Sequence, residues 1–263
     1  MSQIDLQKAA ATATVFLDRA DKGNALSTGM ITRLTEVMEE LADQQDVAVV
    51  VIRGRGNHFC VGADLKEWLE LQNSGDLTLR DKHSIAEQGA KLLNAIQALP
   101  QPTICATQGI ANGGGACIAV ACDFRVAERG ASMGFGEVTV GMNLMWGGLP
   151  LCTRLIGPAR AKRMIMSGKQ FPAETLSEWG MVDYTVDEGD IDAGVQSLVE
   201  EFSGLPPIAL RMIKRSINAV SGASDAAVMH MQSDQWLLAA ATEDCQEGLK
   251  AFFERREPRF TGN

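Results

Sequence analysis

The stretch Gly109-Ile-Ala-Asn-Gly-Gly-Gly-Ala-Cys117, here called the glycine corner, joins a strand-like run, Thr103–Thr107, to a short apolar helix expected over 116–122. Three consecutive glycines at such a junction leave backbone N–H groups uncovered and let a ligand approach the main chain closely. The start of the helix adds partial positive charge at the same point. The stretch therefore predicts an anion site, for a bound phosphate or for an oxygen that becomes negative during a reaction.

The composition of the chain is that of a globular protein, with 263 residues of which 46% are hydrophobic and 22% are charged. This length predicts one large domain, or one domain with an appendage, around a sizeable core. The sequence shows no run of about 18 apolar residues and no signal-peptide pattern, so we expect neither a membrane span nor a membrane partner. The net charge of −9 argues against nucleic acid as the main partner.

Cysteine and histidine spacing bears on compartment and on metal binding. The six cysteines are scattered without a CxxC pair, which favours free thiols in a reducing, cytoplasmic compartment. The three histidines are not spaced as metal ligands and no acidic cluster accompanies them, so we expect no metal site.

Strand-like and helix-like segments alternate along the first two thirds of the chain and predict an α/β core followed by a helical tail. The run from Val47 to Ile52 is continuously apolar and β-branched, which is typical of a buried parallel strand. The polar segment 73–79 is expected to be a mobile loop. The other expected strands are 12–17, 124–127 and 181–186. The other expected helices are 28–41 with Ser27 as its cap, 63–71, 84–99, 159–167 with Gly168 as its C-cap, and the region from Ile191 onward, interrupted at 204–207.

Two further segments share the character of the glycine corner. Phe59-Cys-Val-Gly-Ala-Asp-Leu-Lys66 places small residues just before an expected helix and offers the Ala63 N–H. Gly134-Phe-Gly-Glu-Val-Thr-Val-Gly141 sets one carboxylate, Glu137, among glycines and apolar residues. In the order, spacing and flanks of these segments, the chain resembles the enoyl-CoA hydratase/isomerase (crotonase) superfamily from about Thr12 to Phe260. Similar family motifs also match Asn24-Ala-Leu26, Cys122-Asp123 and Glu247-Gly-Leu-Lys-Ala-Phe252.

The resemblance implies a fold and an assembly. The expected fold is an α/β crotonase (ClpP-like) spiral of ββα units over residues 1–203, which would carry the CoA site and the active site. Residues 204–263 would then form a C-terminal α-helical oligomerisation region. The superfamily usually forms trimers or dimers of trimers, and the apolar tail residues are compatible with that assembly; these are Met229, Trp236, Leu237 and Leu238.

The resemblance also implies roles for particular residues. Backbone N–H groups of Ala63 and Gly114 would hold the thioester oxygen of an acyl-CoA, as two fixed donors suited to a developing enolate. The implied coenzyme A contacts are Ala25 and Leu26 near the adenine, Asp64, Lys66, Gly113 and Arg255, the last of which often reaches a neighbouring subunit in the family. Cationic side chains suit the phosphate groups of coenzyme A. Coenzyme A is here part of the substrate, and no separate cofactor is expected.

The acids depart from the hydratase pattern. Hydratases of the family use two glutamates to activate one water; the second matches Glu137, but the first matches Cys117. A thiol has an ordinary pKa near about 8.5 and cannot replace a carboxylate as a strong acceptor, although a buried space-filling role or a nucleophilic one stays open for it. Isomerases of the family often keep only the carboxylate at the Glu137 position, which moves one proton from C2 to C4.

A base works best when its pKa lies near the operating pH, and burial in a dry pocket raises the pKa of a carboxyl. The apolar residues near Glu137 in sequence could form such a pocket; they are Met133, Phe135, Met142, Leu144, Met145 and Trp146. Of these, Met142, Met145 and Trp146 are expected to line the active site together with Cys117. Met145 matches a position where some family members carry an aspartate, which argues against dienoyl isomerisation and aryl dehalogenation.

The sequence thus favours an acyl-CoA enzyme that stabilises a thioester enolate, with enoyl-CoA double-bond isomerisation ahead of the alternatives. Enoyl-CoA hydration stays open, with Cys117 or a residue from elsewhere in place of the missing acid. Acyl-CoA hydrolysis or decarboxylation would exploit the same oxyanion hole. A CoA-thioester-binding protein without turnover, or a structural subunit of a complex, is the alternative of a different class. Nucleotide binding fits less well, because Gly-Gly-Gly is not GxGxxG and no Walker lysine follows.

Overall fold

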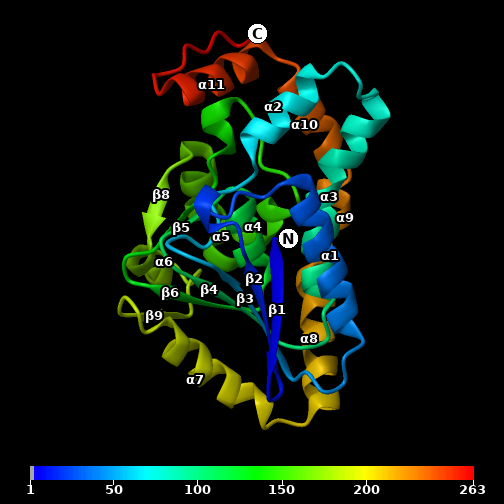
Figure 1. Ribbon diagram of the computed structural model, residues 1–263, viewed down its shortest axis with the longest axis vertical. Coiled ribbons are helices and arrows are strands. Elements are labelled where there is room, and N and C mark those ends of the chain that lie inside the picture. The colour runs from blue at the N-terminus through cyan, green and yellow to red at the C-terminus, as the bar shows by residue number, and fades with distance from the viewer. Residues whose placement is uncertain (1–2) are drawn as a thin grey trace.

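A six-stranded sheet forms the centre of the computed structural model, which describes residues 3–263 apart from the side chains of residues 72 and 73 (Figure 1). The strand order is β1-β2-β3-β4-β6-β9, with β1 and β2 antiparallel and the remaining neighbours parallel. The strands are β1 (Ile4–Ala9), β2 (Thr12–Leu17), β3 (Val49–Gly54), β4 (Thr103–Thr107), β6 (Phe124–Glu128) and β9 (Tyr184–Val186). The expectation of a buried parallel strand around Val47–Ile52 is confirmed, shifted two residues along the chain.

A second, three-stranded sheet runs beside the first. Its order is β5-β7-β8, formed by β5 (Ile110–Asn112), β7 (Ser132–Gly134) and β8 (Gln170–Pro172). The chain alternates between the two sheets: β4 is followed by β5 and helix α4 (Gly114–Ala121), and β6 is followed by β7 and the 3-10 helix η2 (Glu137–Val140). These repeats are ββα units of the expected kind. The consequence for the site is that the three glycines 113–115 and Glu137 each follow a strand of the small sheet.

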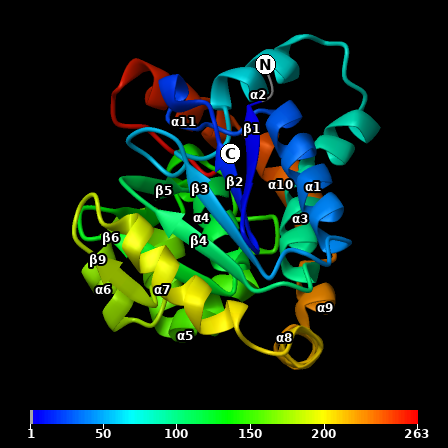
Figure 2. The same cartoon turned by 60° about the horizontal axis from the view of Figure 1, so that its bottom comes forward.

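Helices cover both faces of the large sheet. Val49, Val51 and Ile104 point to one face and pack against α7 (Ile191–Ser203), which crosses the front of the sheet in Figure 2. The other face carries the main core, built with α1 (Thr28–Ala42), α3 (Leu79–Ala98), α4 and α5 (Gly148–Ser167). Residues on both faces are apolar, as expected for parallel strands buried on both sides.

The C-terminal helices fold back onto the core of their own chain. Lys214 on α8 (Pro207–Ser221) donates to the Gln101 carbonyl oxygen at 2.8 Å and pairs with Asp123 at 2.6 Å. In Figure 1, α10 and α11 lie beside α2 at the top. The remaining elements are η1 (Ala20–Lys22), α2 (Leu65–Asn73), α6 (Ala173–Glu178), α9 (Asp225–Met229), α10 (Gln232–Ala240) and α11 (Glu243–Glu254). Within residues 3–263, no helix combines the length and apolar character needed to span a membrane.

Several element boundaries differ from the sequence expectation. Helix α3 begins at Leu79 and not at 84, because Thr78 and Asp81 cap each other's backbone N–H groups. This cap shortens the expected loop 73–79 to Ser74–Thr78. Helix α5 begins at Gly148, and the expected start near Ala159 follows a kink at Gly157 (φ +75°) and Pro158. Helix α2 begins at Leu65, two residues late, since Asp64 is its N-cap. Gly168 ends α5 in the left-handed conformation, as expected.

Candidate active site

Two isolated parallel bridges bring the segment 59–63 against the glycine corner. Cys60 pairs with Ala111 of β5, through Cys60 N–H to the Ile110 carbonyl and Asn112 N–H to the Cys60 carbonyl. On its other side, Ala63 pairs with Leu26, through Leu26 N–H to the Gly62 carbonyl and Asp64 N–H to the Leu26 carbonyl. This register fixes segments distant in sequence as neighbours.

Asn24 holds this arrangement from within the core. Its side chain is fully buried, and its amide nitrogen donates to the carbonyl oxygens of Arg55, His58 and Phe59 at 2.8–3.1 Å. Its amide oxygen accepts from the Arg19 N–H at 2.9 Å. A buried amide with these partners stabilises one backbone conformation on both sides of it. The Asn24-Ala-Leu26 motif is thus a brace for the segment that ends at Ala63.

Two backbone N–H groups beside these bridges have no hydrogen-bond acceptor in the described chain. The Leu26–Ala63 bridge uses the N–H groups of Leu26 and Asp64, so the Ala63 N–H takes no part in it. Gly114 is the first residue of α4, where an N–H has no acceptor within the helix. Neither N–H has a partner in the part of the chain that the structure describes. Such a pair can bind an oxygen that gains negative charge.

Each glycine of the corner meets a different neighbour. Gly113 has φ +49°, and a Cβ there would lie 3.1 Å from the Glu137 Oε1 atom. A Cβ on Gly114 would lie 2.6 Å from Cζ3 of Trp146, and one on Gly115 would lie 2.7 Å from the Cys60 Cβ. The corner is therefore glycine-rich because a carboxylate, an indole and a neighbouring backbone segment all approach it.

Glu137 lies at the start of η2 with its carboxylate close to Gly113. Its Oε2 atom is buried and has no hydrogen-bond partner among residues 3–263. Burial raises the pKa of Glu137 to about 7, and a hydrogen bond from its own backbone offsets this only in part. A carboxyl of this kind can take up and return a proton near neutral pH.

Helix α11 supports the turn that carries Glu137. Gly141 ends η2 at φ +73°, and a Cβ there would lie 2.8 Å from the Cys245 backbone. A Cβ on Gly248 would lie 2.7 Å from the Val140 backbone. The two elements therefore touch backbone to backbone. This contact gives a structural reason for Gly248 in the Glu247–Phe252 motif.

Cys117 is buried, with 1% of its surface exposed. Burial raises the pKa of its thiol well above the usual range, and the nearby Glu137 carboxylate adds to this. The thiol is therefore neutral and a weak nucleophile at neutral pH. A Cβ on Gly148 would lie 2.8 Å from its sulfur, so Cys117 fills space between α4 and α5 beside the Glu137 carboxylate.

The residues expected at the site line one cavity of about 590 Å³. The Ala63, Gly113 and Gly114 backbone, Glu137 and Cys117 lie along it with Ala25 and Leu26. Met142, Met145 and Trp146 also line it, as expected, whereas Met133, Phe135 and Leu144 pack into the main core. The apolar surroundings of Glu137 are thus formed by three of the six apolar residues named from its neighbourhood in sequence, together with residues of other helices.

The three charged residues expected to bind coenzyme A differ in their surroundings. Lys66 is exposed at the cavity wall, 3.9 Å from Glu70, and its ammonium faces solvent. Asp64 lines the cavity, but its carboxylate pairs with Arg19 at 2.8 Å and caps α2 through the Glu67 N–H. Burial alone would raise the pKa of Asp64, but the Glu67 N–H and Arg19 outweigh it and lower that pKa. Asp64 is thus engaged within the protein.

Arg255 lies outside this cavity. It caps the end of α11 in the left-handed conformation, φ +53°, and its side chain is exposed. The cavity wall at this end of the chain is instead formed by Phe252 and Phe253, one turn earlier. Within one chain, Arg255 therefore does not reach the cavity that the other expected residues share.

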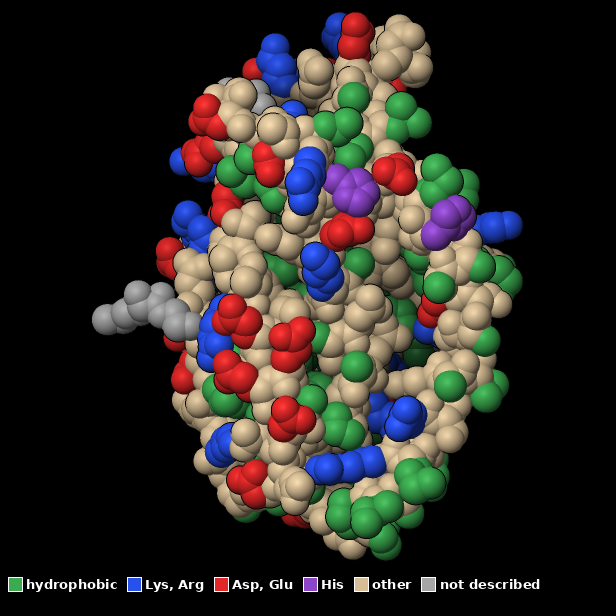
Figure 3. Space-filling view, turned by 90° about the vertical axis from the view of Figure 1, so that its right-hand side faces the viewer, with side chains coloured by type: hydrophobic (Ala, Val, Ile, Leu, Met, Phe, Trp, Pro, Cys, Tyr) green, Lys and Arg blue, Asp and Glu red, His purple; other side chains and the backbone are tan. Residues whose placement is uncertain are grey.

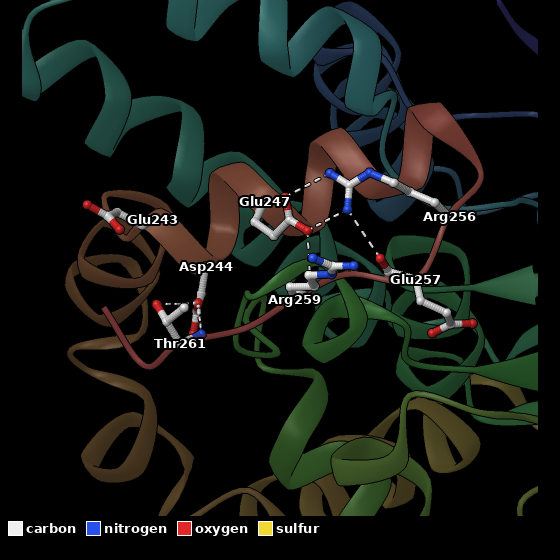
Figure 4. Close-up of a pocket in the computed structure, with 7 residues that line it drawn as sticks. All are labelled: Glu243, Asp244, Glu247, Arg256, Glu257, Arg259 and Thr261. Carbon is white, nitrogen blue, oxygen red and sulfur yellow. Dashed lines mark hydrogen bonds and ion pairs between the residues drawn. The ribbon is translucent and has the colours of Figure 1, made fainter.

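A second cavity, of about 680 Å³, lies where the C-terminal tail returns along α11 (Figure 4). Arg256 and Glu247 of this cavity pair with each other, and Glu247 also accepts from the Arg259 N–H at 2.9 Å. Asp244 accepts from the Thr261 N–H at 2.7 Å. These contacts hold the tail in place, and no unpaired buried base is found among the described residues here.

Several cavity residues were missed by the sequence expectation. Leu65, Trp68 and Leu71 of α2 and Ile85 and Gln88 of α3 line it. Their three-residue spacing is the signal of one helix face, but a helix face alone does not indicate what it covers. The side-chain atoms Trp68 Nε1 and Gln88 Oε1 are buried without a hydrogen-bond partner within residues 3–263. His58, near the same corner, accepts from the Ile110 N–H at 3.3 Å through Nδ1.

The described residues contain no group of three or more His, Cys, Asp or Glu side chains that could hold a metal ion. The groups that this site offers are two backbone donors, one buried carboxylate and an apolar cavity.

Comparison with known proteins agrees with this geometry. A family described as enoyl-CoA hydratase/isomerase matches residues 7–263. The 1,2-epoxyphenylacetyl-CoA isomerase of Escherichia coli (strain K12) is 30% identical over 95% of this chain and 94% of its own. The human mitochondrial enoyl-CoA hydratase domain-containing protein 2 is 34% identical over 94% of this chain and 85% of its own.

Solved structures extend the likeness to the fold. The crystal structure of an enoyl-CoA hydratase from Mycobacterium avium subsp. paratuberculosis K-10 matches 98% of both chains at 27% identity, with a TM-score of 0.88. The α/β crotonase fold expected from the sequence is thus confirmed. The chain belongs to the enoyl-CoA hydratase/isomerase family and is an enzyme of that family.

Proposed function

We propose that the protein isomerises the double bond of an enoyl-CoA thioester, with Glu137 as its sole acid and base. The observation that supports this most strongly is the Glu137 carboxylate itself, buried beside Gly113 with one oxygen unpaired within the described chain and with a pKa of about 7. A base of this pKa can both remove and return a proton at neutral pH.

The proposed reaction uses two groups of the site in sequence. Glu137 removes a proton from C2 of a 3-enoyl-CoA, and the electron pair moves onto the thioester oxygen. The N–H groups of Ala63 and Gly114 donate to that oxygen while it is negative. Glu137 then returns the proton at C4, which leaves the double bond between C2 and C3. Atoms and charge balance without another reactant.

The other carboxylates of the cavity support a single base. Asp64 pairs with Arg19, and Glu67 accepts from the Thr28 hydroxyl at 2.8 Å. Among the described lining residues, Glu137 is left as the carboxylate with an unpaired buried oxygen. Hydration in this family would need a second acid, and the matching position holds the neutral Cys117 thiol. The name of the E. coli relative, an isomerase, points the same way.

The test is to incubate the protein with 3-enoyl-CoA and with 2-enoyl-CoA in deuterated water. We expect 3-enoyl-CoA to be converted to 2-enoyl-CoA with deuterium at C2 or C4, and no 3-hydroxyacyl-CoA. Release of free coenzyme A would indicate hydrolysis, and 3-hydroxyacyl-CoA without a double-bond shift would indicate hydration. Binding without any product across the panel would identify a non-catalytic thioester-binding protein.

We propose further that residues 204–263 join copies of the chain into a trimer or a dimer of trimers. An apolar surface on α8 supports this: Ile208 is 76% exposed, and Met212, Ile213 and Ile217 are more than half exposed. Figure 3 shows hydrophobic side chains gathered at the lower end of the face that carries α8. Exposed apolar surface of this kind is typical of interfaces. Trp236, by contrast, is buried against Trp68 of its own chain.

Light scattering tests this assembly. A trimer would have three times the 28.2 kDa of one chain, and Ile213→Glu should shift it toward the monomer. A wild-type protein that scatters as a monomer at micromolar concentration would refute the assembly.

A further inference from the structure

The cavity gathers most of the tryptophans of the chain. The sequence contains four tryptophans, and Trp68, Trp146 and Trp236 all line this one cavity. Trp68 and Trp236 meet edge to face, with centroids 5.6 Å apart and planes at 72°. Trp146 belongs to the same apolar cluster. Phe252 and Phe253 add two rings to the wall. Aromatic residues are only 5% of the chain, so this concentration is local.

Trp146 is held in its place by unusual backbone and by glycines. Its φ is +65°, a conformation that bulky residues rarely adopt and that persists only where surrounding structure enforces it. A Cβ on Gly89 of α3 would overlap its indole, and one on Gly114 would lie 2.6 Å from Cζ3. Two helices therefore omit a side chain so that this ring can lie against them.

The position of Trp146 relates it to the reacting atoms. Its six-membered ring lies against Gly114, whose N–H is one of the two unpaired donors. A thioester oxygen bound at that N–H would bring the first carbons of the acyl group past the indole. A flat, conjugated group suits such a wall better than a flexible chain, because aromatic rings that stack or meet edge to face attract each other beyond what burial alone contributes.

We propose that the acyl group of the substrate carries an aromatic ring, which lies against Trp146 with Trp68 and Trp236 forming the far wall. The substrate class is then an aryl-substituted acyl-CoA. This inference concerns the same cavity as the proposed isomerisation and rests on acyl-CoA binding there, but it is separable from the identity of the base.

The experiment measures binding without turnover. The probes are phenyl-, cyclohexyl- and n-hexyl-substituted acyl-CoA thioesters with the same spacer, titrated by calorimetry into Glu137→Gln and into the wild type. We expect the phenyl compound to bind about three- to tenfold more tightly than the cyclohexyl compound, since six-carbon rings differ little in apolar area but greatly in stacking. Equal or tighter binding of the cyclohexyl or hexyl compound would overturn the inference, whatever the variants do.

Two variants locate the preference. In Trp146→Leu, the phenyl-to-cyclohexyl ratio should fall to within about twofold, and Trp68→Leu should lower it in part. The matched control is Trp179→Leu, because Trp179 packs on Phe171, with centroids 4.9 Å apart, away from the cavity lining. A ratio that Trp146→Leu and Trp68→Leu both leave unchanged, in proteins with wild-type circular dichroism, would also refute the proposal.

The two proposals fail in different ways. If deuterium enters C2 of the phenyl and cyclohexyl substrates but the two compounds bind equally tightly, the aromatic preference is wrong and the enolate chemistry stands. If all three compounds bind in the expected order but none exchanges, the aromatic cavity stands and the isomerase proposal fails.

Discussion

Glu137 and Glu247 lie on neighbouring elements and have opposite surroundings. Glu137 begins η2, inside an apolar cavity with an unpaired oxygen, and burial raises its pKa to about 7. Glu247 lies on α11, which packs on η2, and its carboxylate bonds to Arg256 and to the Arg259 N–H; these contacts lower its pKa to about 2. The same side chain therefore has a pKa suited to proton transfer where it is buried and unpaired, and anchors a tail where it is exposed and paired.

The largest expected effect is on catalysis. Glu137→Gln keeps the shape of the side chain but removes the base, so C2-proton exchange should fall about a thousandfold. Deuterium incorporation into a 3-enoyl-CoA, followed by mass spectrometry, measures it. Full activity of this variant would show that Glu137 is not the base. The difference between the two glutamates would then have no bearing on catalysis.

The two glutamates should also affect stability with opposite pH dependence. Folded Glu137 holds its proton up to about pH 7, whereas an unfolded glutamate loses it near its ordinary value of 4.5, so the folded state binds more protons between these values. Stability from this group therefore falls as pH rises through that window. Relative to the wild type, Glu137→Gln should gain up to roughly 3 kcal/mol at pH 8 and nothing at pH 4.

The contribution of Glu247 to stability depends on pH in the opposite direction. Its folded pKa is lowered, so its contribution is present above pH 4.5 and is lost as pH falls through about 2. Urea unfolding of the wild type, Glu137→Gln and Glu247→Gln at several pH values tests both signs. If Glu137→Gln is as stable as the wild type at every pH, burial does not raise the pKa of the Glu137 carboxyl as described.

The contact between the two regions passes through Gly248. In Gly248→Ala the new Cβ would lie 2.7 Å from the Val140 backbone, so α11 must move away from η2. We expect a loss of about 1–3 kcal/mol in unfolding free energy, with a lower kcat, because the Glu137 turn loses its support. Gly204→Ala is the matched control, since a Cβ there meets nothing within 4 Å. Equal effects of the two substitutions would mean that α11 does not position Glu137.

The pH–rate profile is a smaller effect that isolates the base. Glu137 must be ionised to take the C2 proton, so kcat/KM should fall about tenfold per pH unit below pH 7 and level off above it. Steady-state rates between pH 5 and 9 measure this. A profile that is flat down to pH 5 would place the base in an exposed, ordinary carboxylate.

The sequence predicts the strands and helices that local residue patterns determine, and it fails where contacts between distant segments determine them. Strand β3 and helix α1 follow local hydrophobic patterns and were expected, β3 as Val47–Ile52, whereas β1 was missed because much of this edge strand is polar and exposed. Strands β5, β7 and β8 are each three residues long, too short for a periodic signal. The short sheet they form is visible only when the chain is folded.

The site shows the same division. Glu137, Ala63 and Gly114 were expected because their motifs resemble those of the family, and the glycine and small residues around them also mark a close approach to the backbone. The rest of the cavity wall could not be expected, because Trp68, Trp236 and Phe252 reach it from helices far apart in sequence. The burial of Glu137, and hence its raised pKa, depends on that tertiary wall as well as on Met142, Met145 and Trp146, so the residues near it in the chain predict it only in part.

The smallest expected effect is that of Glu247→Gln on catalysis. The ion pair with Arg256 is exposed, and exposed pairs contribute little, so kcat/KM should stay within about twofold of the wild type with an unchanged pH profile. The visible change should be local: the Arg259 amide, which donates to Glu247 at 2.9 Å, should exchange faster with deuterated water. If this variant instead shifts the pH profile, the tail cluster is electrostatically coupled to Glu137, and the two regions act as one site.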